Sequence, residues 1–508
     1  MKKRKLMLCS LVSLIMVFMM AVPMTVSAVE VTVTEGPLQS AIDKAASGDV
    51  IKLGQNFNES ITIPADKNIT LDLNGQTLTA VSGKNAIKVE GGLVVKDSTA
   101  TKAPSVSSDY KTVSYTSGKI TATTTTVGVI SGGTFELQSG TVESTGNIGV
   151  AANGELDPSK SAVNSKVTIS GGYVIAQEFA ASPQGNGAEL NVNGGVLVAK
   201  DNAVIAGNGT KTATVDRGGT TINITDGIMI GHIQSPGYIA CGVYHPQSGN
   251  LRISGGTIYA DGGVGILMRS GDLSMTGGKV IATGTAQGKV GDSKIIANCY
   301  GIQVDTESNY PGVSGINASL SENAEVVAAA GVDTIDALGK DAANHIVVAG
   351  GCYSSDVSGF TPSSKVVIKF TSGQDQKYYV GNQKEIQTIA KEAKAGDTID
   401  VIKGSITLDM TTPGVNVNNG PDNKGTVTVN GTTLKPNTGM EIQKPTAPTK
   451  PSQDQTQKPS TDKADAAKTD KTAKTGDDFN LFAVGGVALA AIIAMAAVAI
   501  TGRRHRQR

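Results

Sequence analysis

The stretch LRISGGTIYADGGVGILMRSGDLSMTGGKVIATG, residues 251–284, gives nearly the same pattern twice. LRISGGTIYA at residues 251–260 is followed by LSMTGGKVIA at residues 273–282. In each copy, apolar and polar residues alternate on both sides of a Gly-Gly pair. Such alternation predicts strands with one buried face, and glycine allows the positive φ of a sharp bend. Each copy therefore predicts two short strands joined by a corner.

The same cassette recurs along the chain. Good copies are VTISGGYVIA at 167–176, LNVNGGVLVA at 190–199 and INITDGIMIG at 222–231, and weaker copies surround Gly91, Gly132 and Gly350. Successive good copies begin 22 to 32 residues apart, and a third short apolar strand lies between several of them. One such unit cannot bury its own apolar face, so stacked units must form the core. The repeat predicts a solenoid of parallel strands, about 4.8 Å apart from coil to coil.

The first coils carry a family resemblance. LQSAIDKAASGDVIKL at residues 38–53 predicts an amphipathic helix, a Gly-Asp turn and a strand, and ITLDLNGQTL follows at 69–78. These segments resemble the pectate-lyase-like right-handed parallel β-helix surface proteins of Gram-positive bacteria, over roughly Val31–Phe370. The resemblance implies an all-β, right-handed parallel β-helix at residues 29–370 that an N-terminal amphipathic helix caps.

A second copy of this cap occurs near the end. IQTIAKEAKAGDTIDV at residues 386–401 repeats the helix, the Gly-Asp pair and the strand. Residues 376–438 are therefore expected either to form a small additional module or to close the end of the solenoid, which would otherwise expose unpaired strand edges.

Both ends of the chain predict export and anchoring. Residues 1–28 have the basic, apolar and small-residue regions of a signal peptide, with cleavage expected after Ala28. Residues 444–478 are rich in Pro, Thr, Lys and Asp and predict a disordered linker. The uncharged span 481–500 is long enough for a transmembrane helix, and the basic tail 503–508 is expected to stay cytoplasmic. The solenoid would then be extracellular.

A cell-wall sorting signal is an alternative to retention by this helix. Thr475 and Gly476, followed by an apolar span and a basic tail, resemble the cleavage site of sortase substrates, although Thr472 and Ala473 replace the usual Leu and Pro. The resemblance implies a sortase as a partner and covalent attachment to the wall through Thr475. Anchoring by the membrane helix alone remains open.

Charge and composition exclude some ligand classes. The two ends hold eight of the 44 basic residues and no acid, so Val29–Gly502 contains 36 Lys and Arg against 44 Asp and Glu. An acidic exterior disfavours nucleic acid as a partner. His232 and His245 have no suitably spaced partners for a metal site, so no metal and no cofactor are expected. Cys241, Cys299 and Cys352 have irregular spacing and are expected to be isolated thiols.

The sequence offers one weak catalytic candidate. Aligning the third strands of successive coils stacks Pro246, Arg269 and Asp305, so Arg269 and Asp305 are expected to be neighbours. Asp305 could then act as the acid or base of a glycosidase or lyase. The alternative is a surface ion pair without chemistry. The acidic motifs of polygalacturonase-like and pectate-lyase-like enzymes are absent, which favours the second interpretation.

Two patterns favour a binding face. Tyr238, Tyr244, Tyr259 and His245 cluster in one part of the sequence, and tyrosine suits wet binding surfaces. In addition, an outward position of the second strand is apolar in successive coils, at Ile175, Val198, Ile230, Tyr259 and Ile281. This stripe would mark a partner surface if it is bare. The alternative is that a long segment between strands, such as residues 232–238, covers it.

These observations predict a surface-anchored β-helix that binds a glycan or a surface protein of the host or the cell wall without catalysis. The candidate binding residues are Tyr238, Tyr244, His245, Tyr259, Arg269, Ile230 and Ile281. A polysaccharide lyase or glycoside hydrolase is the first alternative, and a structural spacer is the second.

Overall fold

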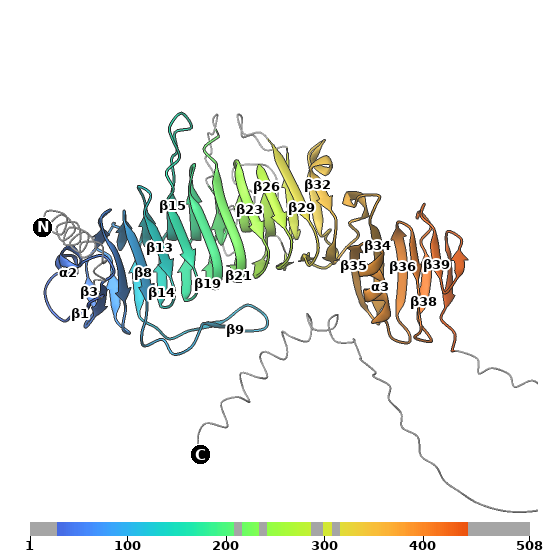
Figure 1. The fold of residues 1–508 in the computed structure, drawn as a ribbon, viewed down its shortest axis with the longest axis horizontal. Coiled ribbons are helices and arrows are strands. Elements are labelled where there is room, and N and C mark those ends of the chain that lie inside the picture. Colours follow the sequence, from blue (N-terminus) through green and yellow to red (C-terminus); the bar gives the residue numbers. More distant parts are fainter. Residues whose placement is uncertain (1–27, 208–215, 233–240, 286–297, 307–314, 445–508) are drawn as a thin grey trace, which may run out of the picture.

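The computed structural model describes residues 28–207, 216–232, 241–285, 298–306 and 315–444. Within them the chain forms an all-β solenoid, as the repeat predicts (Figure 1). Residues 1–27 of the predicted signal peptide 1–28 and residues 445–478 of the predicted linker 444–478 lie outside the described residues. The predicted membrane segment 481–500, the basic tail 503–508, Thr475 and Gly476 lie outside them as well. No helix within the described part of the chain is long and apolar enough to cross a membrane.

Three ladders of parallel strands run along the solenoid, and each coil between its two ends contributes one strand to each ladder. The first ladder contains β1 (Glu30–Val33), β2 (Val50–Leu53), β5 (Asn68–Asp72), β8 (Gly92–Lys96), β13 (Thr134–Leu137), β16 (Lys166–Ile169), β19 (Glu189–Ala199), β21 (Thr220–His232), β23 (Gly249–Ile253), β26 (Gly271–Met275), β29 (Ile316–Leu320) and β32 (Ile346–Val348). The second contains β3 (Phe57–Asn58), β6 (Thr77–Thr79), β11 (Lys119–Ala122), β14 (Thr141–Ser144), β17 (Tyr173–Ala176), the second halves of β19 and β21, β24 (Thr257–Asp261), β27 (Lys279–Thr283), β30 (Glu325–Val327) and β33 (Gly351–Tyr353). The third contains β4 (Ile61–Ile63), β7 (Ile87–Val89), β12 (Val127–Val129), β15 (Ile148–Asn153), β18 (Phe179–Gln184), β20 (Ile205–Ala206), β22 (Cys241–His245), β25 (Val264–Met268), β28 (Ile302–Asp305) and β31 (Ile335–Leu338).

The alternation of the cassette determines which side chains fill the interior. Leu251 and Ile253 on β23 and Ile258 on β24 are buried in the central hydrophobic cluster. Leu273 and Met275 stack on the first pair in the next coil, because β23 and β26 are in register. Each coil therefore supplies backbone partners and apolar neighbours to the next coil, which is why one cassette alone has no core.

The Gly-Gly pairs form the corner between the first and second ladders. Gly172 has φ of +73° and Gly256 has φ of +76°, a left-handed conformation that strains other residues. The first glycine of a pair is required by lack of space: a Cβ added to Gly255 would lie 2.0 Å from the carbonyl oxygen of Thr225. The glycines are thus explained by the turn itself.

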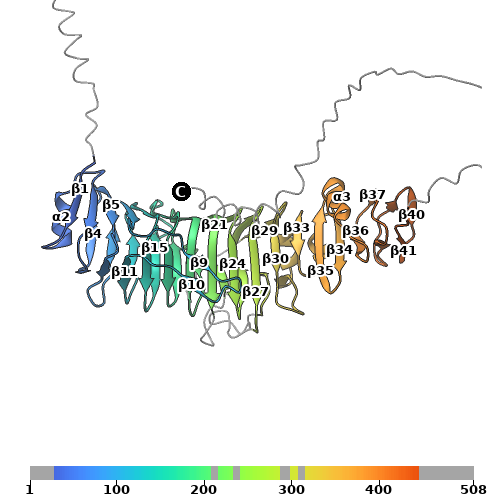
Figure 2. The ribbon, with the colours of Figure 1, turned by 90° about the horizontal axis from the view of Figure 1, so that it is seen from below.

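One coil has a long insertion at this corner. After β8 the chain leaves the solenoid, forms the hairpin of β9 (Ser105–Val106) and β10 (Val113–Ser114), and returns to begin β11. We call residues 101–114 the strap. It extends along the solenoid below the second ladder (Figures 1 and 2).

The structure contains two hydrophobic cores, and a short α-helix packs at the N-terminal end of each. The helix expected near the N-terminus is α2 (Leu38–Lys44), which buries Leu38 and Ile42 against the first coils. A short 3₁₀ helix, η1 (Ala342–His345), precedes the last two strands, and the parallel ladders end at Tyr353. A second 3₁₀ helix, η2 (Ser358–Phe360), follows the last strand. The remaining elements are β34 (Val366–Ser372), β35 (Asp375–Gly381), α3 (Gln383–Lys391), β36 (Thr398–Lys403), β37 (Ile406–Leu408), β38 (Asn416–Asn419), β39 (Val427–Val429), β40 (Thr432–Leu434) and β41 (Thr438–Glu441).

These last elements both cover the solenoid end and have a core of their own. β35 pairs antiparallel with β33, so it covers the final strand edge of the second ladder. A separate hydrophobic cluster then extends from Val366 to Ile442 and includes Ile386 of α3. The structure thus has features of both alternatives that the sequence left open for this region.

Candidate functional site

Arg269 and Asp305 lie side by side, as the alignment of the third strands expects. Met268 of β25 pairs with Val304 of β28, which places the next residues, Arg269 and Asp305, opposite each other. Arg269 Nε lies 3.2 Å from Asp305 Oδ2. The side chains are only 5% and 1% exposed, so the expectation of a surface ion pair is wrong: this pair is buried.

Tyr244 completes this buried group. Arg269 Nη1 donates a hydrogen bond of 3.1 Å to the Tyr244 hydroxyl, from one coil to the next. In the following coil Gln303 donates to Asp336 at 2.7 Å. Arg269 and Asp305 each have an oppositely charged partner, and both side chains are shielded from solvent. The arrangement suits a structural ion pair better than an acid–base catalyst.

His245 and Cys241 are also buried. His245 Nδ1 lies 2.9 Å from the carbonyl oxygen of Ser270, and burial lowers the pKa of the imidazole. Burial raises the pKa of the Cys241 thiol, which favours the unreactive protonated form. Cys241, Cys299 and Cys352 are free thiols, as the spacing predicts. Tyr238, another candidate binding residue, lies outside the described residues.

The apolar stripe exists, but it is not bare. Val198, Ile230, Tyr259 and Ile281 occupy one register position on four successive coils, and Ile175 precedes them. They belong to a hydrophobic cluster outside the solenoid interior. Its members are Val196, Val198, Ile230 and Tyr259, with Val106, Tyr110, Val113, Tyr173, Ile175, Ile228 and Ile281 packed against them.

The strap is what covers this stripe. Val106, Tyr110 and Val113 come from the strap, and the Tyr110 ring stacks on Tyr259 with centroids 4.7 Å apart. Ile230 is completely buried. The stripe is therefore covered, as the second of the two alternatives predicted, and the covering residues belong to the segment 101–114. The suggested cover at 232–238 lies almost wholly outside the described residues.

The sequence contained a signal for the strap that alternation alone did not reveal. The cassette corners at Gly91 and Gly132 are farther apart than those of the good copies, so this coil has extra residues. Within the excess, Val106, Tyr110 and Val113 are apolar among Ser, Thr, Asp and Lys. Their partners could not be assigned because they lie several coils away along the axis.

An open groove lies between the base of the strap and the glycine corners. Its volume is about 510 Å³. One wall consists of residues 100–104 together with Tyr115, and the floor crosses four coils. The floor residues are Gln138, Ser139, Ser170, Gly171, Gly172, Gly194, Gly195, Val196, Asp226, Gly227 and Ile228. Five of these eleven floor residues are glycines, so backbone peptide groups form part of the floor beside the side chains.

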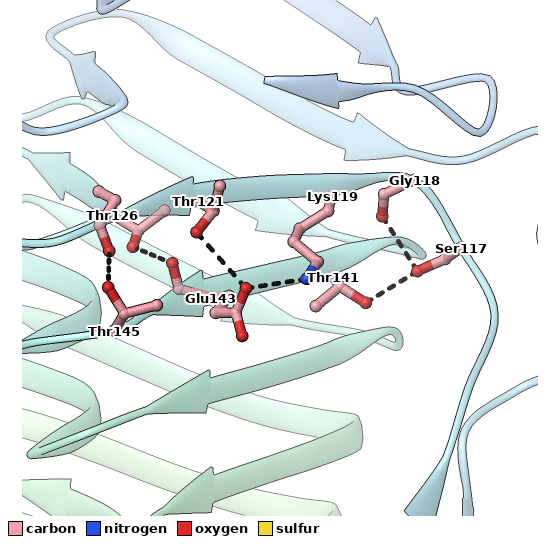
Figure 3. A network of polar contacts seen from close by, with 9 residues as sticks. Ser117, Gly118, Lys119, Thr121, Thr126, Thr141, Glu143 and Thr145 are labelled. Carbon is pink, nitrogen blue, oxygen red and sulfur yellow. Dashed lines mark hydrogen bonds and ion pairs between the residues drawn. The ribbon is translucent and has the colours of Figure 1, made fainter. Parts of the chain in front are cut away.

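Polar contacts hold the segment that follows the strap. Lys119 Nζ lies 2.9 Å from Glu143 Oε2, and Thr121 also donates to that carboxylate (Figure 3). Ser117 and Thr141 share a hydrogen bond of 2.8 Å between their hydroxyls (Figure 3). In the next coil, burial beside Glu143 raises the pKa of Tyr173 to about 12, so its hydroxyl stays protonated. The hydrogen bonds and the ion pair join residues 117–121, where the chain re-enters the solenoid after the strap, to β14 of the next coil.

Comparison with known proteins does not assign a function to this groove. No family model, curated protein or solved structure matches this chain. Within the described ranges, no group of three or more His, Cys, Asp or Glu side chains is arranged to hold a metal ion.

Proposed function

We propose that this chain is an exported, surface-anchored, right-handed β-helix that binds a linear glycan in the groove beside the strap, without catalysis. The observation that carries the proposal is the contrast between two places. The groove is open and has polar side chains and glycine backbone among its apolar lining residues, whereas Arg269 and Asp305 are buried in an ion pair. Export and anchoring rest on the sequence of both ends, with membrane retention or sortase attachment through Thr475 as the two routes.

The chemistry of the groove favours an extended, hydroxyl-rich ligand. Peptide groups recur on its floor once per coil, about 4.8 Å apart, a spacing close to the length of one pyranose unit. Lys102 and Asp226 are exposed at the groove and can bind hydroxyls. The half-buried ring of Tyr115 offers an apolar face beside them.

A blocking substitution tests the groove directly. Ser170 is exposed at a corner on the groove floor, and Ser254 occupies the same cassette position outside the groove. The full-length chain in detergent micelles would be applied to an array of linear glycans. We expect Ser170→Trp to abolish binding to the glycans that the parent chain retains, and Ser254→Trp to leave that binding intact.

The outcomes separate the proposal from its alternatives. Equal binding by the parent and Ser170→Trp would place the ligand elsewhere. Glycan cleavage that disappears in Asp305→Asn would favour the polysaccharide-degrading enzyme. An array without any retained glycan would favour the structural spacer.

A further inference from the structure

The strap is attached to the solenoid in two different ways, at its base and along its length. At the base, the Asp97 carboxylate accepts hydrogen bonds from the backbone N–H of Thr99, where the chain leaves, and of Gly118, where it returns. Gly140 N donates to the Tyr115 hydroxyl at 3.0 Å, which fixes the returning segment again. The base is therefore held by several charge-assisted or buried hydrogen bonds.

Along its length the strap has no comparable attachment. The hydrogen bonds of residues 101–114 in the described structure stay within the strap, such as Ser107 Oγ to Asp109 and Thr112 N to Ser107 Oγ. Its two strands share only two residue pairs, and an isolated hairpin of this size is marginal in water. What holds the strap down is apolar contact with the stripe and the Tyr110–Tyr259 stack.

The strap covers a surface that water would otherwise reach. We call Val196, Val198, Ile230 and Tyr259 the seat; these side chains are at most 6% exposed. They belong to the outward face of the second ladder, so the solenoid interior does not need them. Lifting the strap would leave every ladder paired while it exposes a contiguous aliphatic and aromatic patch.

A titratable group, His232, lies near the tip of the strap. His232 is the last residue of β21 and pairs with Asp261 of β24. Lys111 follows Tyr110, whose ring stacks on Tyr259, and Tyr259 pairs in register with Ile230, two residues before His232. The strap tip is thereby held near this imidazole, on which the Lys111 charge acts. Burial lowers the pKa of His232, Asp261 opposes this effect, and Lys111 adds to it. These two are the charged groups that act on His232 in the described structure.

The sign of the coupling follows from linkage. With the strap closed, the pKa of His232 is below its ordinary value, and releasing the strap removes Lys111 and part of the burial. The closed state then binds fewer protons than the open state, so acidification favours opening. The base persists meanwhile, because its hydrogen bonds hold the pKa of Asp97 below the ordinary range despite burial.

We propose that the strap is a releasable cover over the apolar seat, held closed by Val106, Tyr110 and Val113 and opened when His232 is protonated beside Lys111. The inference is independent of the ligand in the groove. It assigns a conformational switch to the face of the solenoid that carries the predicted apolar stripe.

The chain contains no tryptophan, so one introduced indole reports the strap alone. The experiment uses the full-length Tyr110→Trp chain in micelles, with fluorescence and circular dichroism recorded from about pH 8 to about pH 5. We expect the indole emission to shift to longer wavelength on acidification while the strand signal in circular dichroism stays constant. A second reporter, Tyr259→Trp on the seat, should shift over the same range.

Three further variants define the outcome. Val106→Asp with Val113→Asp, in the reporter chain, should give the long-wavelength emission at every pH, because the strap no longer docks. His232→Gln should abolish the pH-dependent shift, and His345→Gln, outside the strap contacts, should retain it. The proposal is overturned if the double Asp variant emits like the parent, if acid leaves the emission unchanged, if His232→Gln shifts normally, or if the strand signal is lost together with the shift.

Discussion

The two capping helices, α2 and α3, use nearly the same contacts at the start of two different cores. Gln39 of α2 exchanges hydrogen bonds with the backbone of Thr62, and Gln383 of α3 does so with Thr407. Asp49 accepts from the N–H of Ala46, and Asp397 from that of Lys394. A Gly-Asp turn and a helical glutamine thus form one reusable device that covers the first coil of a solenoid.

The difference between the two caps lies in what surrounds them. After α2, β2 is paired with parallel strands on both sides and begins a core that continues to the last coil. Next to α3, β34 pairs antiparallel with β35, which precedes the helix, and with β36, which follows it. This second core contains only two short parallel pairings, β36–β38 and β37–β39. The same start therefore leads to a long or a very short solenoid, depending on how many cassettes follow.

The largest effect should come from a charge in the second core. Ile386 of α3 is fully buried in the cluster of residues 366–442, which is separate from the solenoid interior. We expect Ile386→Asp to destabilise this region by more than about 4 kcal/mol, since it buries an unpaired charge. Hydrogen exchange should show lost protection at residues 366–442 and retained protection in the three ladders, with exposed Lys384→Asp as control. Equal loss in both regions would mean that the two cores fold as one.

The glutamine contacts should differ in strength. Gln39→Ala leaves the partly buried N–H of Thr62 without its 2.7 Å acceptor, whereas Gln383→Ala affects an exposed contact of 3.0 Å at Thr407. We expect a loss of roughly 1–2 kcal/mol for Gln39→Ala and less for Gln383→Ala. Local opening free energies from hydrogen exchange would check the order, and a reversed order would contradict the role of burial.

The helix N-termini are capped in different ways, which gives a smaller effect. Asn382 and Glu385 form a reciprocal capping box at α3, while Pro37 offers no cap to α2. Glu59, from the next strand connection, accepts from the N–H groups of Leu38 and Gln39 instead. We expect Asn382→Ala and Glu59→Ala each to cost about 1 kcal/mol, and Asn382→Asp to cost little. Hydrogen exchange in the first turn of each helix measures both.

The smallest effect concerns acid. The N–H groups of Val29 and Ala46 hold the pKa of Asp49 below its ordinary value. The carboxylate therefore adds stability above its unfolded-state pKa, and this contribution is lost as pH falls through the folded-state pKa. Thermal unfolding of Asp49→Asn should depend less on pH in the acid range than that of the parent. A parallel acid profile in both chains would contradict this contribution.

The repeat made the ladders predictable because the period-two pattern and the Gly-Gly corners are local properties of the sequence. The neighbours Arg269 and Asp305 followed from the same register. Their burial did not, because exposure depends on segments that leave the ladders and pack elsewhere. A pattern identifies the outward face of a strand, but it does not show which outward faces are covered.

The strap illustrates the same limit at Tyr259 and Tyr110. Tyr259 was correctly placed on the outside of the second ladder, yet its partner comes from a coil far earlier in the chain. Nothing local in the strap specifies the direction in which it lies along the axis. The groove was missed for the same reason, since one of its walls is the base of the strap.

The corner from which the strap departs shows how such a molecule tolerates growth. The first ladder continues from β8 to β13, and the second from β6 to β11, without a shift in register across the insertion. Lengthening a surface connection carries an entropic penalty that rises only slowly with its length. A glycine corner of this kind can therefore accept an inserted segment while the stacked aliphatic layers beneath it keep their register.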